Sequence, residues 1–203
     1  MSLFFTEDGL KIALDAVIDG DNPSGSVTHV GAYDAGTPIT SVTGEADNDT
    51  FTKASHGLTN GTVVKLSSLS GGTGLNVNKW YFVIGVAGND FQLAAVPGGS
   101  AVPFSTDVTS VTVTPFVEIS GGSYARQAIA FNAAATHADG ATIDDSTNGA
   151  VIPIPGGSTV SAISGHTASS AGTLLFLDEV TEEAFAGDGT YTVTDVDATL
   201  SVS

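Results

Sequence analysis

Short runs of β-branched and aromatic residues recur along most of the chain, and each run is bounded by glycine, asparagine, aspartate or proline. Such runs are typical of β-strands, because β-branched side chains pack well on a pleated surface and the bounding residues favour turns. The sequence therefore predicts a mainly β fold, either a sandwich or a small barrel. The predicted strands span residues 26–33, 49–54, 61–68, 79–86, 89–95, 109–119, 124–131, 158–164, 172–180 and 189–202.

One stretch near the start has the apolar period of an α-helix instead. Thr6 is a suitable N-cap, and Glu7 and Asp8 favour the positive end of the helix dipole. Turn-forming residues at 19–25 end this predicted short helix. Its apolar stripe consists of Leu10, Leu14, Val17 and Ile18.

Charge is distributed unevenly along the chain. Residues 36–115 hold five acidic side chains, three lysines and the only tryptophan, Trp80. Residues 117–203 hold 11 acidic side chains and a single basic one, Arg126, the only arginine in the protein. The two segments therefore differ enough to be separate structural modules.

Two prolines, Pro38 and Pro115, stand near the ends of the less acidic segment. We therefore predict a discontinuous β-sandwich domain, formed by residues 1–35 and 117–203, that begins with the short helix. The remaining residues, 36–116, are predicted to form an inserted, small, β-barrel-like module.

The overall charge excludes several classes of function. The 203 residues include 22 acidic and five basic side chains, which gives a formal net charge of −17. Binding to nucleic acid needs clustered lysine and arginine, and an anionic membrane repels negative charge, so neither is an expected partner. There is no cysteine, which excludes disulfides and thiolate chemistry. No secretion signal or membrane-spanning run is apparent, so we expect synthesis in a cytoplasm.

Candidate chemistry is sparse, and we predict no catalytic, cofactor or metal site. The histidines lack metal-ligand spacing, and no nucleophile elbow or phosphate loop occurs. Pairs of acidic residues at turns offer oxygen ligands, but none follows the twelve-residue calcium loop, so Ca²⁺ at these turns stays open. Paired carboxylates for glycoside hydrolysis also stay open as an alternative. The histidines are His29, His56, His137 and His166.

Three stretches carry a resemblance to a known family. They are "GGSYARQAIAFNAA" (121–134), "AVIPIPGGSTVSAISGHTASSAGTLLFLDEVT" (150–181) and "AFAGDGTYTVTDVDATLSV" (184–202). They resemble small virion structural proteins of tailed bacteriophages, which are labelled as capsid decoration, minor tail or tail-fibre proteins. The resemblance covers residues 1–36 and 117–203, so it also implies that the intervening segment is an insertion.

The insertion has a resemblance of its own. "DNDTFTKASHGLTNGTVVKLSSL" (47–69), "NKWYFVIGV" (78–86) and "NDFQLAA" (89–95) are similar to a β-rich module of phage tail and surface proteins, which is in turn similar to a half-domain of ubiquitin-activating enzymes. Without cysteine, this likeness implies no ubiquitin chemistry. We interpret Trp80 as a core residue of this module, and an exposed edge that binds sugar as the less favoured role.

Arg126 lies in the Tyr-Ala-Arg-Gln segment of the predicted strand 124–131, between Tyr124 and Gln127. A guanidinium presents five donors in a planar fork, which suits a carboxylate or turn carbonyls. We therefore interpret Arg126, Tyr124 and Gln127 as structural or interface residues, with Arg126 as a clamp.

We interpret the protein as a capsid decoration protein on the outer surface of the phage head, made in the host cytoplasm and bound to the major capsid protein. The alternatives are a minor tail, tail-tip or fibre component that contacts the host surface, and a small carbohydrate-active enzyme. The negative charge favours an outward position, because packaged DNA would repel it.

The first residues predict a docking arm. Leu3, Phe4 and Phe5 place three apolar side chains together ahead of the helix cap, where water would otherwise surround them. We expect them to be buried against a neighbouring copy, or added as a strand to a sheet edge, in a homo-oligomer. The resemblance implies a homotrimer, since decoration proteins often sit on three-fold positions.

Overall fold

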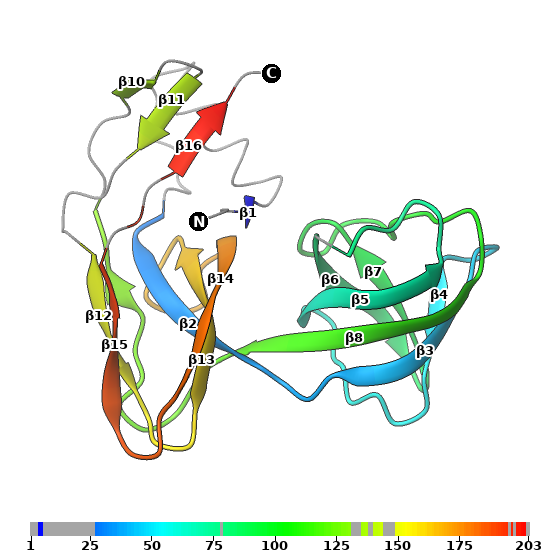
Figure 1. The fold of residues 1–203 in the computed structure, drawn as a ribbon, viewed down its shortest axis with the longest axis horizontal. Helices are drawn as coiled ribbons and strands as arrows, with labels where there is room; N and C mark the ends of the chain where they lie inside the picture. The colour runs from blue at the N-terminus through cyan, green and yellow to red at the C-terminus, as the bar shows by residue number, and fades with distance from the viewer. Residues whose placement is uncertain are drawn as a thin grey trace. The chain divides into compact units, whose positions relative to one another are not determined.

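The computed structural model describes residues 4–5, 27–77, 79–130, 135–137, 140–143, 149–194, 196 and 198–201. In these residues the protein is built from β-strands and loops (Figure 1), which confirms the mainly β class. The helix predicted to begin at Thr6 lies outside the described residues. No helix long and apolar enough to cross a membrane occurs in the described part of the chain.

The chain divides into two compact units. The first, called the outer unit here, combines Met1–Asp34 with Glu118–Ser203, and the second, called the barrel unit, is Ala35–Val117. That each unit folds by itself stays a prediction.

The barrel unit is a closed, six-stranded antiparallel β-barrel. Its strands pair in the order β8-β3-β4-β7-β6-β5, and β5 pairs back onto β8, so no strand edge is left open. This confirms the barrel-like module of the sequence prediction. The strands are β3 (Ile39–Glu45), β4 (Thr50–Thr52), β5 (Val63–Gly71), β6 (Trp80–Ala87), β7 (Asp90–Ala94) and β8 (Val108–Glu118).

Two bulges let so few strands close into a barrel. The pairing of β3 with β8 is irregular around Ser41, and that of β5 with β8 is irregular around Ser68. Both serines have a positive φ, 55° and 51° respectively. Bulges bend a strand and increase its twist, so they curve the two strands that flank β8.

The barrel interior is filled by large apolar side chains, among which Phe51 lies 5.5 Å from Phe91 and 5.2 Å from Phe104 between ring centroids. The buried residues of this core are Val42, Phe51, Leu58, Val64, Leu66, Tyr81, Val83, Phe91, Leu93, Phe104, Val108, Val111 and Val113.

Trp80 is buried but does not belong to this interior cluster. Because side chains alternate along a strand and its neighbour Tyr81 faces the interior, Trp80 lies on the outer face of β6. There it packs edge-on against Phe116, with 4.7 Å between ring centroids, and the Lys65 ammonium lies 5.4 Å above its ring. Trp80 therefore serves the module as a packing residue, on the opposite side of the strand from the main core.

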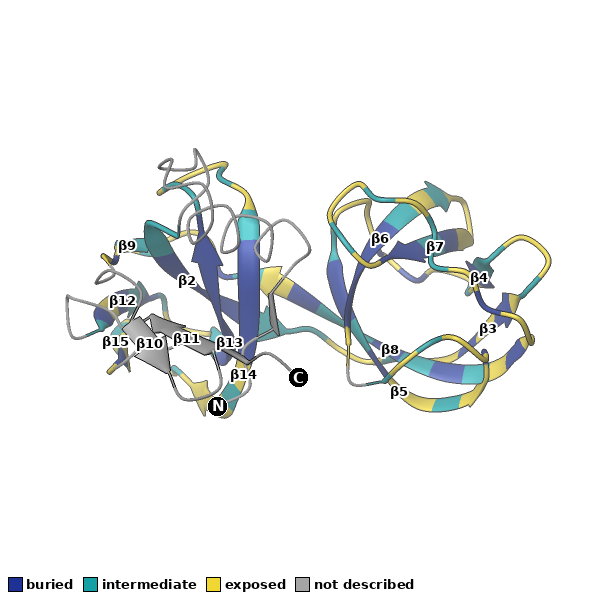
Figure 2. Cartoon of the chain, turned by 90° about the horizontal axis from the view of Figure 1, so that it is seen from above, coloured by how far each residue is buried: buried dark blue, intermediate teal, exposed yellow. Residues whose placement is uncertain are grey.

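The outer unit is built on a sheet in which β1, β14, β13 and β2 follow one another, with β9 beside β2. Figure 2 shows buried residues along β2 and β13, whereas β14 is buried only in its first half. A two-stranded ribbon, β12 with β15, and a three-stranded sheet, β10-β11-β16, complete it. The strands are β1 (Phe4–Phe5), β2 (His29–Ala35), β9 (Gln127–Ala128), β10 (Ala135–His137), β11 (Gly140–Ile143), β12 (Ala150–Ile154), β13 (Thr159–His166), β14 (Leu174–Ala184), β15 (Gly189–Val193) and β16 (Ala198–Ser201).

The core of the outer unit lies between the ribbon and the sheet. Ile152 and Val193 of the ribbon share one buried cluster with Val30, Ile163 and Phe176 of the sheet. In the described residues, this packing of the ribbon on the sheet is the part of the predicted sandwich that is seen. The full cluster is Val30, Ala32, Ile119, Ile129, Ala150, Ile152, Ile154, Val160, Ile163, Phe176, Val193 and Val196.

Several predicted strands were wrong in extent or missing. The strand predicted at 124–131 is only β9, Gln127–Ala128, because residues 121–123 form a bend and turn and residues 124–126 have no regular secondary structure. The strand predicted at 189–202 is two strands, β15 and β16. Strand β3 was missed because serine and threonine interrupt its apolar residues. Strand β12 was missed because Pro153 is atypical of a strand, although it is tolerated in a ribbon whose only ladder is with β15.

The two ends of the barrel unit lie side by side. The Gly36 amide donates to the Pro115 carbonyl over 2.8 Å, and, in the outer unit, the Ile119 amide donates to the Ala32 carbonyl over 3.0 Å. The chain therefore leaves and re-enters the outer unit through neighbouring points, which is the geometry that tolerates a domain insertion.

We expect the outer unit to fold when residues 35–117 are replaced by a short Gly-Ser linker, since a short link bridges neighbouring ends. Residues 35–117 expressed alone should also unfold cooperatively, because the closed barrel has its own core. Circular dichroism can follow the linker variant, and Trp80 fluorescence can follow the isolated barrel. Aggregation of the linker variant, or non-cooperative melting of both pieces, would contradict the prediction.

Candidate functional site

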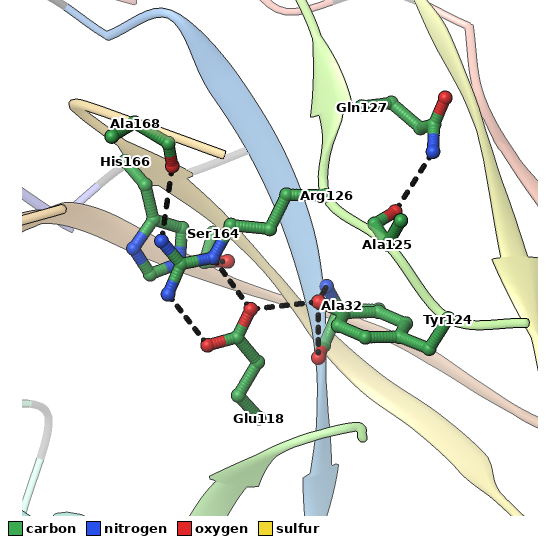
Figure 3. Close-up of polar contacts among 9 residues, drawn as sticks. All are labelled: Ala32, Glu118, Tyr124, Ala125, Arg126, Gln127, Ser164, His166 and Ala168. Atoms are coloured by element: carbon green, nitrogen blue, oxygen red, sulfur yellow. Dashed lines mark hydrogen bonds and ion pairs between the residues drawn. The ribbon is translucent and has the colours of Figure 1, made fainter. Parts of the chain in front are cut away.

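Arg126 is the centre of a connected cluster of polar side chains in the described part of the outer unit (Figure 3). Its Nε donates to Glu118 Oε1 over 2.6 Å, and its Nη2 donates to Glu118 Oε2 over 2.7 Å. Its Nη1 donates to the Ala168 carbonyl over 3.0 Å. The guanidinium thus holds a carboxylate with two parallel bonds and a loop carbonyl with the third, as its planar fork allows.

Tyr124 extends the cluster to the strand that precedes the barrel. Its hydroxyl donates to Glu118 Oε1 over 2.9 Å and accepts the Ala32 amide over 3.0 Å. Ala32 is the middle residue of β2, two residues before the outer unit is interrupted after Asp34, and Glu118 is the last residue of β8. The cluster therefore joins the two points at which the outer unit is interrupted, and we call Arg126, Glu118 and Tyr124 the root clamp.

The ion pair of the root clamp is partly buried. The Arg126 side chain is 10% exposed and that of Glu118 is 25% exposed. Partial burial would raise the pKa of Glu118, but the hydrogen bonds from Arg126 and Tyr124 outweigh it and hold that pKa below its ordinary value. The bond to Glu118 raises the pKa of Arg126 in turn. Both groups therefore stay charged at neutral pH.

Behind the clamp lies a buried imidazole. His166 is 1% exposed, stacks on Tyr33 with 6.3 Å between ring centroids, and shares a 2.9 Å hydrogen bond between its Nε2 and Ser164 Oγ. Its Nδ1 has no hydrogen-bond partner among the described residues, although the backbone of Gly172 lies near the ring. Burial first, and the Arg126 charge second, lower the pKa of His166 to about 4. The ring is therefore neutral at pH 7.

Gly31 provides the space into which these polar groups fit. A β-carbon at this position would lie 2.7 Å from Tyr124 Oη, 3.0 Å from Ser164 Oγ and 3.2 Å from Glu118 Oε1. Contacts under 3.0 Å force a displacement, so an alanine here would push the Tyr124 hydroxyl away from its partners.

The chemistry of this cluster suits holding rather than catalysis. Ser164 and His166 form a hydroxyl–imidazole pair, but both are buried and no carboxylate orients Nδ1 in the described residues. No group of three or more His, Asp or Glu side chains that would suit a metal ion occurs in the described part of the chain. The cluster fixes positions in the fold, and that is the role we assign to it.

The structure separates the predicted site residues. Tyr124 and Arg126 share the root clamp, whereas the Gln127 amide donates only to the Ala125 carbonyl over 2.8 Å and points away from the clamp (Figure 3). Phe4 and Phe5 form β1, which pairs with Leu177 and Phe176 of β14 in the same chain. Leu3 lies outside the described residues, and the interface role of these three residues stays a prediction.

Sequence reasoning missed Glu118, Ser164 and His166. Glu118 is the last residue but one of a predicted strand and was one acidic residue among many. His166 looked like an isolated histidine because its neighbours Tyr33, Glu118 and Arg126 come from other segments of the chain. A signal was present in the spacing of Ser164 and His166, which places both side chains on one face of a strand.

Comparison with known proteins identifies a family. The family model of the podophage GP4 fiber I protein gp80 matches residues 93–199, which is just over half of the chain. The match includes Glu118, Tyr124, Arg126 and His166, and it begins inside the barrel unit, at Leu93. No curated protein and no solved structure is significantly similar to the chain.

Replacement of Gly31 by alanine should destabilise the outer unit by about 1–3 kcal/mol, the usual effect of overpacking. Gly187→Ala is the matched control, because a β-carbon there meets nothing within 4 Å. Urea unfolding followed by circular dichroism measures the difference. Equal stability of the two variants would show that the cluster adapts without loss.

Arg126→Lys should cost about 1–3 kcal/mol, because lysine keeps the charge but loses the bidentate bond. Arg126→Met should cost more than the double variant Arg126→Met, Glu118→Gln, since the double variant leaves no unpaired charge. Urea unfolding followed by circular dichroism measures the free energy of unfolding of each variant in this double-mutant cycle. Trp80 lies in the barrel unit, so its fluorescence checks that the barrel is unaffected. A wild-type melting curve for Arg126→Lys would refute the clamp.

Proposed function

The chain belongs to the family of the podophage GP4 fiber I protein gp80, a phage tail-fibre family, and we propose that it is a fibre subunit that contacts the host surface. The single observation that carries this proposal is the family match over residues 93–199. The protein is thus a structural component of the virion, and the family implies no enzymatic activity.

The match favours the fibre alternative over capsid decoration. Our expectation of a head location depended on the net charge of −17, which argues for a position away from packaged DNA. A fibre satisfies that electrostatic condition equally well, so charge does not distinguish the two locations. Contact with the major capsid protein gains no support from the match and stays a prediction.

We propose that the barrel unit makes the contact with the host. Residues 35–92, most of the barrel unit, lie outside the matched segment, whereas the described core of the outer unit after Glu118 lies within it. A closed barrel offers no strand edge for pairing with other subunits, so its loops are what it presents to solvent. The outer unit then supplies the fibre framework.

Location on the virion tests the fibre assignment. Electron microscopy of phage particles, with an antibody fragment against the barrel unit, should label appendages in few copies. Particles that carry the linker variant without residues 35–117 should keep the outer unit but adsorb poorly to cells. Dense, regular label over the head would overturn the assignment, and unimpaired adsorption would overturn the role of the barrel.

We also propose that fibre subunits meet through the outer face of the β12–β15 ribbon. Val151 is 53% exposed and pairs across the ribbon with Thr192, while Pro153 pairs with Thr190. No charged residue occurs at 149–157 or 189–194. In so acidic a chain, a second copy meets least repulsion at such an uncharged face. The face is smaller than a stable interface needs, so it would form part of a larger contact.

Val151→Glu should therefore weaken self-association, because it places a charge on the uncharged face. Val117→Glu is the matched control, since Val117 is also an exposed valine on a strand, at 57%. Sedimentation at several concentrations measures the oligomer. A monomeric wild-type protein, or equal weakening by both substitutions, would contradict the proposed face.

A further inference from the structure

The loop between β13 and β14, residues 167–173, is closed by its own hydrogen bonds. The Thr167 amide donates to the Thr173 carbonyl over 3.1 Å, and the Thr173 amide donates to Thr167 Oγ1 over 2.9 Å. Ala171 has a positive φ of 57°, a conformation that costs a residue with a side chain about 1 kcal/mol or more. The closed form of this loop is therefore strained, and something must hold it.

Arg126, which lies outside the loop, holds it by a hydrogen bond. Its Nη1 bond to the Ala168 carbonyl is the contact by which the root clamp reaches the loop. The guanidinium is kept in place by both oxygens of Glu118. The loop is thus tied, through one arginine, to a carboxylate that must remain charged.

His166 stands directly before this loop, at the end of β13. Tyr33 and His29 face it from β2, Glu118 from the end of β8, and Arg126 from the irregular segment just before β9. On β14 the residue opposite His166 is the uncharged Leu174, and the ladder is irregular between Gly165 and His166. The strand end that carries the imidazole is therefore the point from which the ring can leave its site with least disruption.

We propose that residues 167–173 form an acid-released latch, which Arg126 holds closed while Glu118 is charged and His166 is neutral, and which opens locally before the outer unit unfolds. A proton on His166 places a second positive charge beside Arg126 in a buried site, and a proton on Glu118 removes the anion that fixes Arg126. Both changes release the Ala168 carbonyl. This inference does not depend on the fibre assignment.

The direction of the effect follows from proton linkage. The pKa of His166 is about 4 in the closed form, and exposure to water would return it to about 6.5. The open form therefore binds more protons between these values, so the closed form is favoured above about pH 6.5 and loses that advantage as the pH falls to 4. The open fraction should rise by about 80-fold between pH 6.5 and pH 4. The lowered pKa of Glu118 acts in the same direction at still lower pH.

Hydrogen exchange of the wild-type chain, corrected for the intrinsic rate at each pH, tests the proposal. The peptide that covers 166–174 should lose protection by at least about tenfold between pH 6.5 and 4.5. A peptide from the barrel strand β6 should not change, and one from β2 should change less than the loop. Protection of the loop that is independent of pH, or lost together with that of β2, would overturn the latch.

Two variants separate the histidine from its neighbours. His166→Gln keeps a polar partner for Ser164 without a titrating ring, so loop protection should become flat from pH 6.5 to 4.5. His29→Gln is the matched control, because His29 pairs with His166 across the strands but is only partly buried, and it should behave as wild type. Arg126→Lys should expose the loop already at pH 7. If His29→Gln rather than His166→Gln removed the pH dependence, the proposal would be wrong.

Discussion

The ion pair between Arg126 and Glu118 is the interaction on which the continuity of the outer unit depends. This unit is interrupted after Asp34 and resumes at Glu118. An unstructured insertion would cost closure entropy that rises with its length. A folded barrel whose ends are hydrogen-bonded, Gly36 to Pro115, removes most of that cost because it behaves as a short link. The pair then fixes the point at which the chain returns.

The same pair explains why an acidic chain retains a single arginine. Twenty-two carboxylates offer partners, so attraction alone would not select one of them. Selection comes from geometry: Tyr124 donates to the same oxygen of Glu118, and Gly31 leaves room for both groups. A lysine could also pair with a carboxylate, but it could not make the two parallel hydrogen bonds to Glu118, since it lacks the planar fork.

Particular residues show how much of the fold and of the candidate site can be predicted from the sequence. Runs of β-branched and aromatic residues bounded by turn residues were enough to predict β5, β6, β7 and β8 to within a few residues, because the buried part of each strand is made of apolar residues. Strand β3 was not predicted because its closure of the barrel depends on a bulge at Ser41, and a bulge leaves no trace in the spacing of apolar residues. Glu118 was not predicted as the partner of Arg126 for another reason. It is close to Arg126 in sequence, but its selection depends on Ala32 and Gly31, which lie on the other side of the insertion.

The prediction of function from the sequence was limited in the same way. Net charge constrains where a virion protein can lie relative to DNA, but it acts at long range and is blind to which outer structure carries the protein. The family match resolves that question through residues 93–199, which contain the root clamp except for its contact at Ala32. The matched segment therefore includes the point at which the chain returns from the barrel unit to the outer unit. Because each unit has a buried cluster of its own, an insertion at this point adds a folded module without adding residues to the core of the outer unit.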